Sequence, residues 1–380
     1  VEGDFVIANG KFKPGFYTHT ICGKFDASGG EFKPSSGVIY IKAGTDTIIL
    51  GEGNNFYDLQ IEATGVITAY DSLRIHNDFT LISGTFDAGS YTHEIWGDWN
   101  TQGGTFTPTA GKILFKGGDA QVTLGTGNNF YNVEIDKTGS LTALSALRIK
   151  GDFVLKAGKF IPGNYVHEIE GDWIEIGGEF KPTEGEIEFK GEKQYVNQLS
   201  GNRFHNVKIL SDTLIINSDV KIWGDLEIEG LFLTNGYNVL VKGNWVDTLG
   251  VFQPTSGKVI LCGVSQNIYQ SNANNFYVLE IDSQSITTAQ TDLRISDDLR
   301  IRKGKFVLQA HTCVVNDSII IDSVFQINNG KLLSDGLICV NNKGLLQIIN
   351  SCTLRVKDTI LIKQGGKFSS GGTKPVIKGK

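Results

Sequence analysis

The stretch Gly53-Asn54-Asn55-Phe56-Tyr57-Asp58-Leu59-Gln60-Ile61 returns at residues 127–135, which read Gly-Asn-Asn-Phe-Tyr-Asn-Val-Glu-Ile. Other landmarks keep this spacing: Asp4-Phe5 recurs as Asp78-Phe79, Asp152-Phe153, Asp225-Leu226 and Asp298-Leu299, and Pro34 recurs as Pro108, Pro182 and Pro254. Self-similarity at a fixed period is typical of repeat architectures, in which each unit stacks on its neighbours. The sequence therefore predicts a single repeat array rather than the two or three globular domains that 380 residues would otherwise suggest.

Within one copy of the repeat, the residues alternate between apolar and polar. Residues 58–62, 132–136 and 185–190 all show this pattern. Alternation over four to eight residues indicates strands with one buried face. The recurring Gly-Gly pairs and Phe-x-Pro phrases between these stretches indicate corners, because glycine supplies positive φ and proline lacks a backbone donor. We expect an all-β protein with almost no helix.

A shorter period lies inside the 74-residue repeat, since Phe5 and Phe25 head similar phrases. Four coils of roughly 18–19 residues would fill one repeat, which is a typical turn size for a parallel β-solenoid, or β-helix. About 20 coils would give a rod of roughly 95 Å, and the crossover rule favours a right-handed coil. Two alternatives are a string of β-sandwiches, for which linkers are missing, and a five-bladed propeller, whose blades need fewer strands than each copy holds.

The repeat also sets the predicted domain organisation. Residues 1–298 form four 74-residue repeats, and residues 299–380 form a diverged fifth repeat that continues the same solenoid. The proline and Asn-Phe-Tyr landmarks vanish in this last part. The chain has no methionine, which suggests a processed chain or a fragment of a longer one.

Composition and charge limit the kinds of molecule that the sequence predicts as partners. The net charge is −6 and the basic residues are dispersed, so nucleic acid is not expected as a partner. No signal peptide is visible, and no apolar run reaches the length of about 18 residues that a membrane span needs, so none is predicted. Five cysteines occur outside the repeat pattern and without a CxxC pair, which argues against a zinc site. We interpret them as buried apolar residues, with one local disulfide, Cys339 with Cys352, as the alternative.

The phrases at residues 53–61 and 127–135, and Gly84–His93 followed by Gly97-Asp98-Trp99, resemble repeats of large bacterial secreted and cell-surface proteins. That family is similar to adhesins with right-handed parallel β-helix regions. The resemblance covers residues 3–298 and fades beyond them. It implies an extracellular or cell-surface location in bacteria, and it carries over no catalytic residue.

Three groups of residues suggest chemistry, and the repeat argues against each. His19, His93 and His167 occupy one repeat position, so about four coils of ~4.8 Å would separate them and they could not share a metal. Asp297-Asp298, together with Arg148-Ile149-Lys150, faintly resembles β-helix galacturonan hydrolases, but Asp298 and Arg148 are both repeat features. The Gly-Gly-x-Gly-x-Asp turns of calcium-binding repeats do not occur, although a lone calcium in an acidic corner stays open. We therefore predict no catalytic residue, no cofactor and no metal site.

Surface contacts are the remaining type of site. Trp99, Trp173 and Trp245 share a repeat position and are expected to point inward. Trp96 falls where other copies have Cys22 and Glu170, so it is the strongest candidate for an exposed contact residue. The paired asparagines could also contact a glycan, which adds Asn54, Asn128 and Asn274 to the candidates. The alternative for these asparagines is to satisfy backbone groups at tight corners.

The sequence thus predicts a non-enzymatic extracellular structural protein: a stiff rod, stalk or filament segment at the bacterial cell surface. Its predicted partners are further copies of itself, end to end or side by side, or cell-surface glycans. A glycan-binding adhesin is the alternative function, and a polysaccharide-degrading β-helix enzyme is a weaker one.

Overall fold

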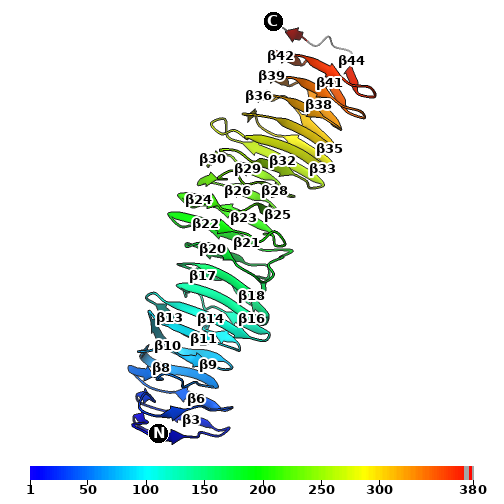
Figure 1. The fold of residues 1–380 in the computed structure, drawn as a ribbon. Helices are drawn as coiled ribbons and strands as arrows, with labels where there is room; N and C mark the ends of the chain where they lie inside the picture. Colours follow the sequence, from blue (N-terminus) through cyan, green and yellow to red (C-terminus); the bar gives the residue numbers. More distant parts are fainter. Residues whose placement is uncertain (372–375, 379–380) are drawn as a thin grey trace. The chain divides into compact units, whose positions relative to one another are not determined.

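The computed structural model describes residues 1–371 and 376–378, and within them every regular element is a β-strand and none is a helix. Residues 372–375 and 379–380, the end of the predicted fifth repeat, lie outside the described residues. The chain divides into two compact units, Val1–Gly185 and Glu186–Lys380. Each unit is a parallel β-solenoid, and together they contain about 18 turns (Figure 1). The predicted all-β solenoid class is confirmed.

Parallel pairing between successive turns builds both units. Phe5 lies opposite Phe25, and Thr18 opposite Val38, so each of these turns takes about 20 residues. Where a corner carries extra residues the turn is longer, as in the step from Phe25 to its partner Ile48. Every register pairing in the described strands is parallel, which excludes the antiparallel sandwiches and propeller blades considered as alternatives.

In the N-terminal unit the strands stack into three ladders. The first ladder holds β1 (Phe5–Val6), β4 (Phe25–Asp26), β7 (Asp46–Ile49), the later halves of β8 (Asp58–Ala69) and β10 (Phe79–Gly89), β13 (Thr105–Pro108), β17 (Arg148–Ile149) and β19 (Val166–Ile169). The second holds β2 (Lys11–Phe12), β5 (Glu31–Phe32), β9 (Arg74–Ile75), β11 (Thr92–Ile95), β14 (Lys112–Gly117), the early halves of β16 (Asn132–Ala143) and β18 (Phe153–Ile161), and β20 (Trp173–Glu175). The third holds β3 (Thr18–Ile21), β6 (Val38–Ile41), the early halves of β8 and β10, β12 (Trp99–Asn100), β15 (Ala120–Thr123) and the later halves of β16 and β18.

The C-terminal unit has the same plan. One ladder holds β21 (Glu186–Phe189), β23 (Asn206–Ile209), β26 (Leu226–Ile228), β29 (Trp245–Asp247), β32 (Ser265–Gln270), the later halves of β33 (Val278–Ala289) and β35 (Leu299–Leu308), β38 (Val324–Asn328), β41 (Leu345–Ile349) and β44 (Lys367–Gly371). Another holds β25 (Val220–Ile222), β28 (Val239–Val241), β31 (Lys258–Leu261), the early halves of β33 and β35, β37 (Ile319–Ile321), β40 (Ile338–Val340) and β43 (Ile360–Ile362). The remaining strands are β22 (Lys193–Asn197), β24 (Thr213–Ile216), β27 (Leu231–Leu233), β30 (Val251–Gln253), β34 (Leu293–Ile295), β36 (Thr312–Val315), β39 (Lys331–Ser334), β42 (Thr353–Val356) and β45 (Val376–Lys378).

The sequence repeat does not coincide with a whole number of turns. Phe5, Phe79 and Phe153 occupy one repeat position, yet they lie in the first, third and second ladder of the N-terminal unit. After Phe5 the chain passes through the first ladder three more times, in β4, β7 and β8, and reaches Phe79 two ladders later. The second and third copies are therefore each rotated about the axis of the N-terminal unit by roughly a third of a turn relative to the copy before. The predicted coil was too short, which is why about 18 turns form rather than about 20.

The alternation seen in the sequence decides which side chains are buried. In β8, Leu59 and Ile61 are fully buried while the intervening Gln60 is half-buried. Because equivalent strands pair in register, buried rings stack from turn to turn. Phe79 stacks on Trp99 with ring centroids 4.4 Å apart, and Phe153 stacks on Trp173 at 4.2 Å. The core of each unit is thus a column of apolar side chains in close contact.

Candidate functional site

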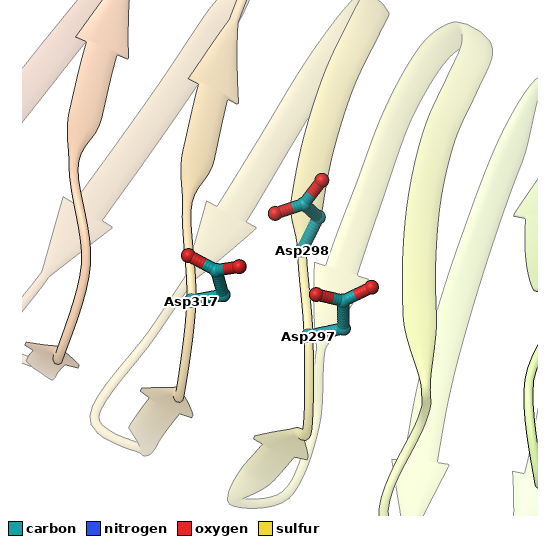
Figure 2. Close-up of side chains that lie close together, drawn as sticks. All are labelled: Asp297, Asp298 and Asp317. Atoms are coloured by element: carbon teal, nitrogen blue, oxygen red, sulfur yellow. The ribbon is translucent and has the colours of Figure 1, made fainter.

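One group of three side chains in the described residues has the spacing of a metal site: Asp297, Asp298 and Asp317 in the C-terminal unit (Figure 2). They lie just before β35 and β37, whose register places Leu299 opposite Ile319. One carboxylate oxygen from each lies within 4.8 Å of the others. Burial, together with the neighbouring Asp298 and Asp317 carboxylates, raises the pKa of Asp297.

The contacts of Asp298 give this aspartate an architectural role. Its Oδ1 accepts a hydrogen bond from the backbone N–H of Ser318 in the next turn, at 3.2 Å. Its Oδ2 accepts a bond from the Arg300 guanidinium at 2.8 Å. The aspartates at the same repeat position accept the same bond from the next turn, at 2.9, 2.8, 2.9 and 2.6 Å for Asp4, Asp78, Asp152 and Asp225. The Asp298 carboxylate therefore links adjacent turns in the manner of its equivalents.

The basic residues considered with this pair also have local partners. Arg148 Nε lies 3.9 Å from a Glu168 carboxylate oxygen, and the Lys150 ammonium pairs with the Glu170 carboxylate. Both basic residues belong to the N-terminal unit, whereas the Asp297-Asp298 pair belongs to the C-terminal unit. These basic residues are thus accounted for by ion pairs between neighbouring turns.

Asn54, Asn128 and Asn274 lie inside the solenoid, 3%, 3% and 2% exposed. The Asn54 side-chain oxygen accepts a bond from Phe32 N at 2.9 Å, and its amide nitrogen donates to the carbonyls of Ala27, Gly30 and Leu50. Asn128 makes the equivalent bonds to Phe106, Thr101 and Gly104. These contacts support the corner role, in which an amide satisfies backbone groups where the chain turns.

The recurring histidines are corner residues too. His93 Nδ1 accepts a bond from Leu73 N at 3.1 Å, and its Nε2 donates to the Ala88 carbonyl at 2.8 Å. His167 repeats both contacts, with Leu147 and Pro162. Burial lowers the pKa of His93, and it lowers the pKa of His167 to about 4. Both rings are therefore neutral at physiological pH, and each uses both nitrogens within its own corner.

The three tryptophans expected to point inward do so, whereas Trp96, expected to be exposed, is only partly so. Trp99, Trp173 and Trp245 are fully buried, and Trp96 is half-buried at the surface. The Trp96 ring lies 4.6 Å from the His76 ring and 5.0 Å from the Lys116 ammonium. Trp223, 42% exposed, lies 3.7 Å from the Arg203 guanidinium and 3.5 Å from the Lys242 ammonium. Cations and rings from neighbouring turns thus cover part of both surface tryptophans.

All five cysteines are free, so the alternative disulfide between Cys339 and Cys352 is wrong. Cys339 and Cys352 are both buried and pack in the core, as the preferred interpretation holds. Cys22 is exposed and Cys262 is half-buried, so the buried interpretation does not hold for Cys22.

Two buried ionisable groups escaped the sequence reasoning. Lys137 Nζ donates to the Trp96 and Lys116 carbonyls at 3.4 and 2.5 Å, and burial lowers its pKa to about 8. Asp247 is fully buried with both oxygens accepting from Asn274 Nδ2, and burial raises its pKa to about 7. The sequence does contain a signal for Asp247. The first two copies have the uncharged residues Ala27 and Thr101 at this repeat position, so a carboxylate there departs from them.

Comparison of the chain with protein-family models, with curated proteins and with solved structures finds no match. Within the described residues, no helix has the length and apolar character needed to cross a membrane.

Proposed function

We propose that this chain is a non-enzymatic structural protein, a right-handed β-solenoid of five 74-residue repeats that acts as a stiff spacer. The observation that carries this proposal is the placement of the recurring side chains. His93, Asn128 and Trp99, three of the side chains that recur, are buried and bonded or packed inside the corners and core. The histidine, asparagine and tryptophan positions of the repeat thus serve its interior, which favours a structural role over display of these side chains.

The rotation between copies supports the same proposal. Equivalent residues such as Phe5, Phe79 and Phe153 lie in three different ladders. A linear ligand that ran along one face would therefore not meet the same surface motif in successive copies. This geometry disfavours the multivalent use of one repeated motif and favours a mechanical role.

We further propose that the protein works outside the cell, at a bacterial surface, where copies associate with one another. The location rests on the resemblance of residues 3–298 to secreted and cell-surface repeats. Self-association rests on a general property of parallel solenoids, in which the strands of a terminal turn present unpaired N–H and C=O groups to another chain.

Sedimentation velocity over a wide range of protein concentration tests the association. The expected result is a sedimentation coefficient that rises with concentration, with filaments in electron micrographs of the concentrated sample. A single species at every concentration would contradict the self-association part of the proposal.

Activity on acidic and neutral polysaccharides tests the claim that the protein is not an enzyme. We expect no loss of polymer length with any substrate. Depolymerisation that disappears in Asp298→Ala, in a variant whose circular dichroism matches the wild type, would replace the structural proposal with a catalytic one.

A further inference from the structure

One ladder of the C-terminal unit changes the character of its outer face along its length. This ladder runs from β21 to β44, and in β21, β23 and β26 the outward side chains include Glu188, opposite Lys208, which in turn lies opposite Glu227. The charges end in the next two turns, where Val246 and Tyr269 continue the same row. Because these side chains point away from the core, packing of the interior does not require the change.

From β32 to β44, in successive turns of the unit, the middle row of this outer face has no charged residue (Figure 1). Each residue of the row pairs in register with the residue in the next turn. The row consists of Asn267, Thr288, Val307, Gln326, Gln347 and Ser369.

A second row lies beside the middle row on the same strands. It holds Ile286, Val324 and Leu345, together with Lys305 and Lys367. We call the outward side chains of β32, β38, β41 and β44 and of the later halves of β33 and β35 the carboxylate-free face. None of these strand segments contains an aspartate or a glutamate.

The side chains of this face are held in place by their neighbours. Val307 and Gln326, in the middle row, are each only 9% exposed although they point outward, because side chains of the adjacent turns cover them. At one end of the row, Gln290 Nε2 donates to Asn267 Oδ1 at 2.7 Å, and Asn267 Nδ2 donates to Asn244 Oδ1 at 3.3 Å. A face that is ordered in advance loses little side-chain entropy when another surface packs on it.

The composition of the face favours a second copy of the chain as its partner. The chain has a net charge of −6, so two copies repel each other wherever carboxylates would meet, and this face has none. Side-chain amides both donate and accept hydrogen bonds, so the same surface can bond to itself. Ile286 and Tyr269, 42% and 36% exposed, would lose water in such a contact. Sheets pack face to face in this way about 10 Å apart.

The face is also large enough for such a pair. Strands in six successive turns, spaced ~4.8 Å apart, with five residues of about 3.3 Å each, cover roughly 500 Å² on one copy. Two copies would bury about 1,000 Å², the size at which specific interfaces begin. A two-fold axis parallel to the axis of the unit would place the row of Lys305 and Lys367 opposite the row of Asn328 and Ile349, so the lysines would not meet.

We propose that two copies of this chain pack side by side through the carboxylate-free face, sheet against sheet. The inference rests on the self-association in the proposed function and names a surface for it. End-to-end stacking would use the strand edges of the terminal turns instead. Apolar contacts and amide hydrogen bonds hold the lateral pair, and ion pairs do not.

Two glutamines provide a matched pair of variants. Gln347 lies in the middle row of the face, and Gln253 points outward from β30 in another ladder of the same unit. Gln347→Glu and Gln253→Glu make the same isosteric change and add the same charge. Only Gln347→Glu places its carboxylate in the contact, where it loses water and meets the same charge on the other copy. Circular dichroism and thermal unfolding establish that each variant folds.

Sedimentation velocity of the full chain, over a wide range of concentration, measures the association of the wild type and both variants. We expect Gln347→Glu to raise the concentration of half-association about tenfold or more, and Gln253→Glu to leave it unchanged. Raised ionic strength should not weaken the association of the wild type, because no ion pair holds the two copies together.

The possible failures can be told apart. If the wild type associates and Gln347→Glu associates equally well, or if both variants weaken association equally, the face is not the contact and self-association uses another surface. A wild type that stays a single species at every concentration would overturn the self-association of the proposed function as well. If that single species co-sediments with phosphatidylcholine vesicles or with an insoluble neutral polysaccharide, and Gln347→Glu does not, the face has a different partner and the proposal is overturned.

Discussion

Asp247 is a buried carboxyl group whose ionisation bears on the stability of the C-terminal unit. The carboxyl group is fully buried among strands, and the Asn274 amide donates to its two oxygens at 2.9 and 2.8 Å. Burial raises its pKa from 3.8 to about 7, because the interior disfavours the charged form. The folded protein therefore holds a proton that the unfolded chain has already released near pH 4.

The first prediction follows from this difference in proton binding. Between about pH 4 and pH 7 the folded state binds more protons than the unfolded state, so the free energy of unfolding falls as the pH rises. Asp247→Asn, which mimics the protonated form, removes this fall. We expect the variant to gain roughly 3 kcal/mol over the wild type between about pH 5 and pH 8 in chemical denaturation. If the free energy of unfolding depended on pH in the same way in the wild type and the variant, the raised pKa of the buried Asp247 carboxyl group would be contradicted.

His167 gives a prediction of the opposite sign. Burial lowers its pKa from 6.5 to about 4. Between these two pH values the unfolded chain binds a proton at this histidine and the folded protein does not. The free energy of unfolding of the wild type should fall as the pH drops from about 6.5 to 4. His167→Ala leaves Leu147 N without its acceptor, so it should lose about 1–3 kcal/mol at neutral pH. The variant should lose less free energy of unfolding on acidification than the wild type does. An equal loss would contradict the lowered pKa of His167.

Sequence reasoning at this scale succeeds where the repeat is regular. The inward Trp99, Trp173 and Trp245 follow from their shared position in an alternating pattern. Asp247 was missed because it is a polar residue at an inward position, and alternation alone does not predict what its carboxyl group bonds.

At the scale of one corner, buried asparagines hold the chain in its turn. Asn128 accepts from Phe106 N and donates to the carbonyls of Thr101 and Gly104, each at 3.0 Å. Asn128→Ala removes all three bonds and leaves buried backbone groups unsatisfied, so we expect a loss of about 2–4 kcal/mol. Asn129→Ala, at the half-buried neighbouring residue, is the matched control and should lose much less. Equal losses in thermal and chemical denaturation would rule out the corner role.

Glycine corners offer a comparison that separates strain from crowding. Gly158 and Gly127 both have positive φ, 81° and 83°. A Cβ at Gly158 would lie 2.6 Å from the Gly139 carbonyl oxygen, whereas a Cβ at Gly127 meets open space. Gly127→Ala should cost about 1–2 kcal/mol, the strain of a left-handed residue. Gly158→Ala should cost clearly more in the same denaturation assay, because the adjacent turn must also shift; an equal cost would mean that the turns do not approach this closely.

Strands and the corners between them could largely be predicted from the sequence. Alternation predicts β8 and β16, and the Gly-Gly and Phe-x-Pro phrases mark corners between strands. The roles of the paired asparagines could not be decided, because a side chain that caps a corner and one that faces solvent have the same composition and spacing. Only the hydrogen bonds of Asn54 and Asn128 distinguish the two.

At the scale of the whole molecule, the relation between repeat and turn was the main error of the sequence reasoning. The offset between Phe5 and Phe25 was read correctly, and these residues pair in the first ladder. The error was to assume that one repeat contains a whole number of coils. Nothing in the physics of parallel pairing requires this, since any copy can begin in any of three ladders so long as its strands remain in register.

Distances between paired spin labels test this rotation most directly, in a background without native cysteines. Thr20 and Asn100 lie in one ladder, linked through the paired strands β6, β8 and β10, whereas Glu94, the repeat equivalent of Thr20 in the next copy, lies in another ladder. Four strand spacings of ~4.8 Å put the 20/100 pair roughly 19 Å apart along one face. We expect the 20/94 pair to be farther apart than the 20/100 pair. A 20/94 distance shorter than the 20/100 distance would mean that equivalent residues share a face, and would contradict the rotated repeat on which the structural proposal rests.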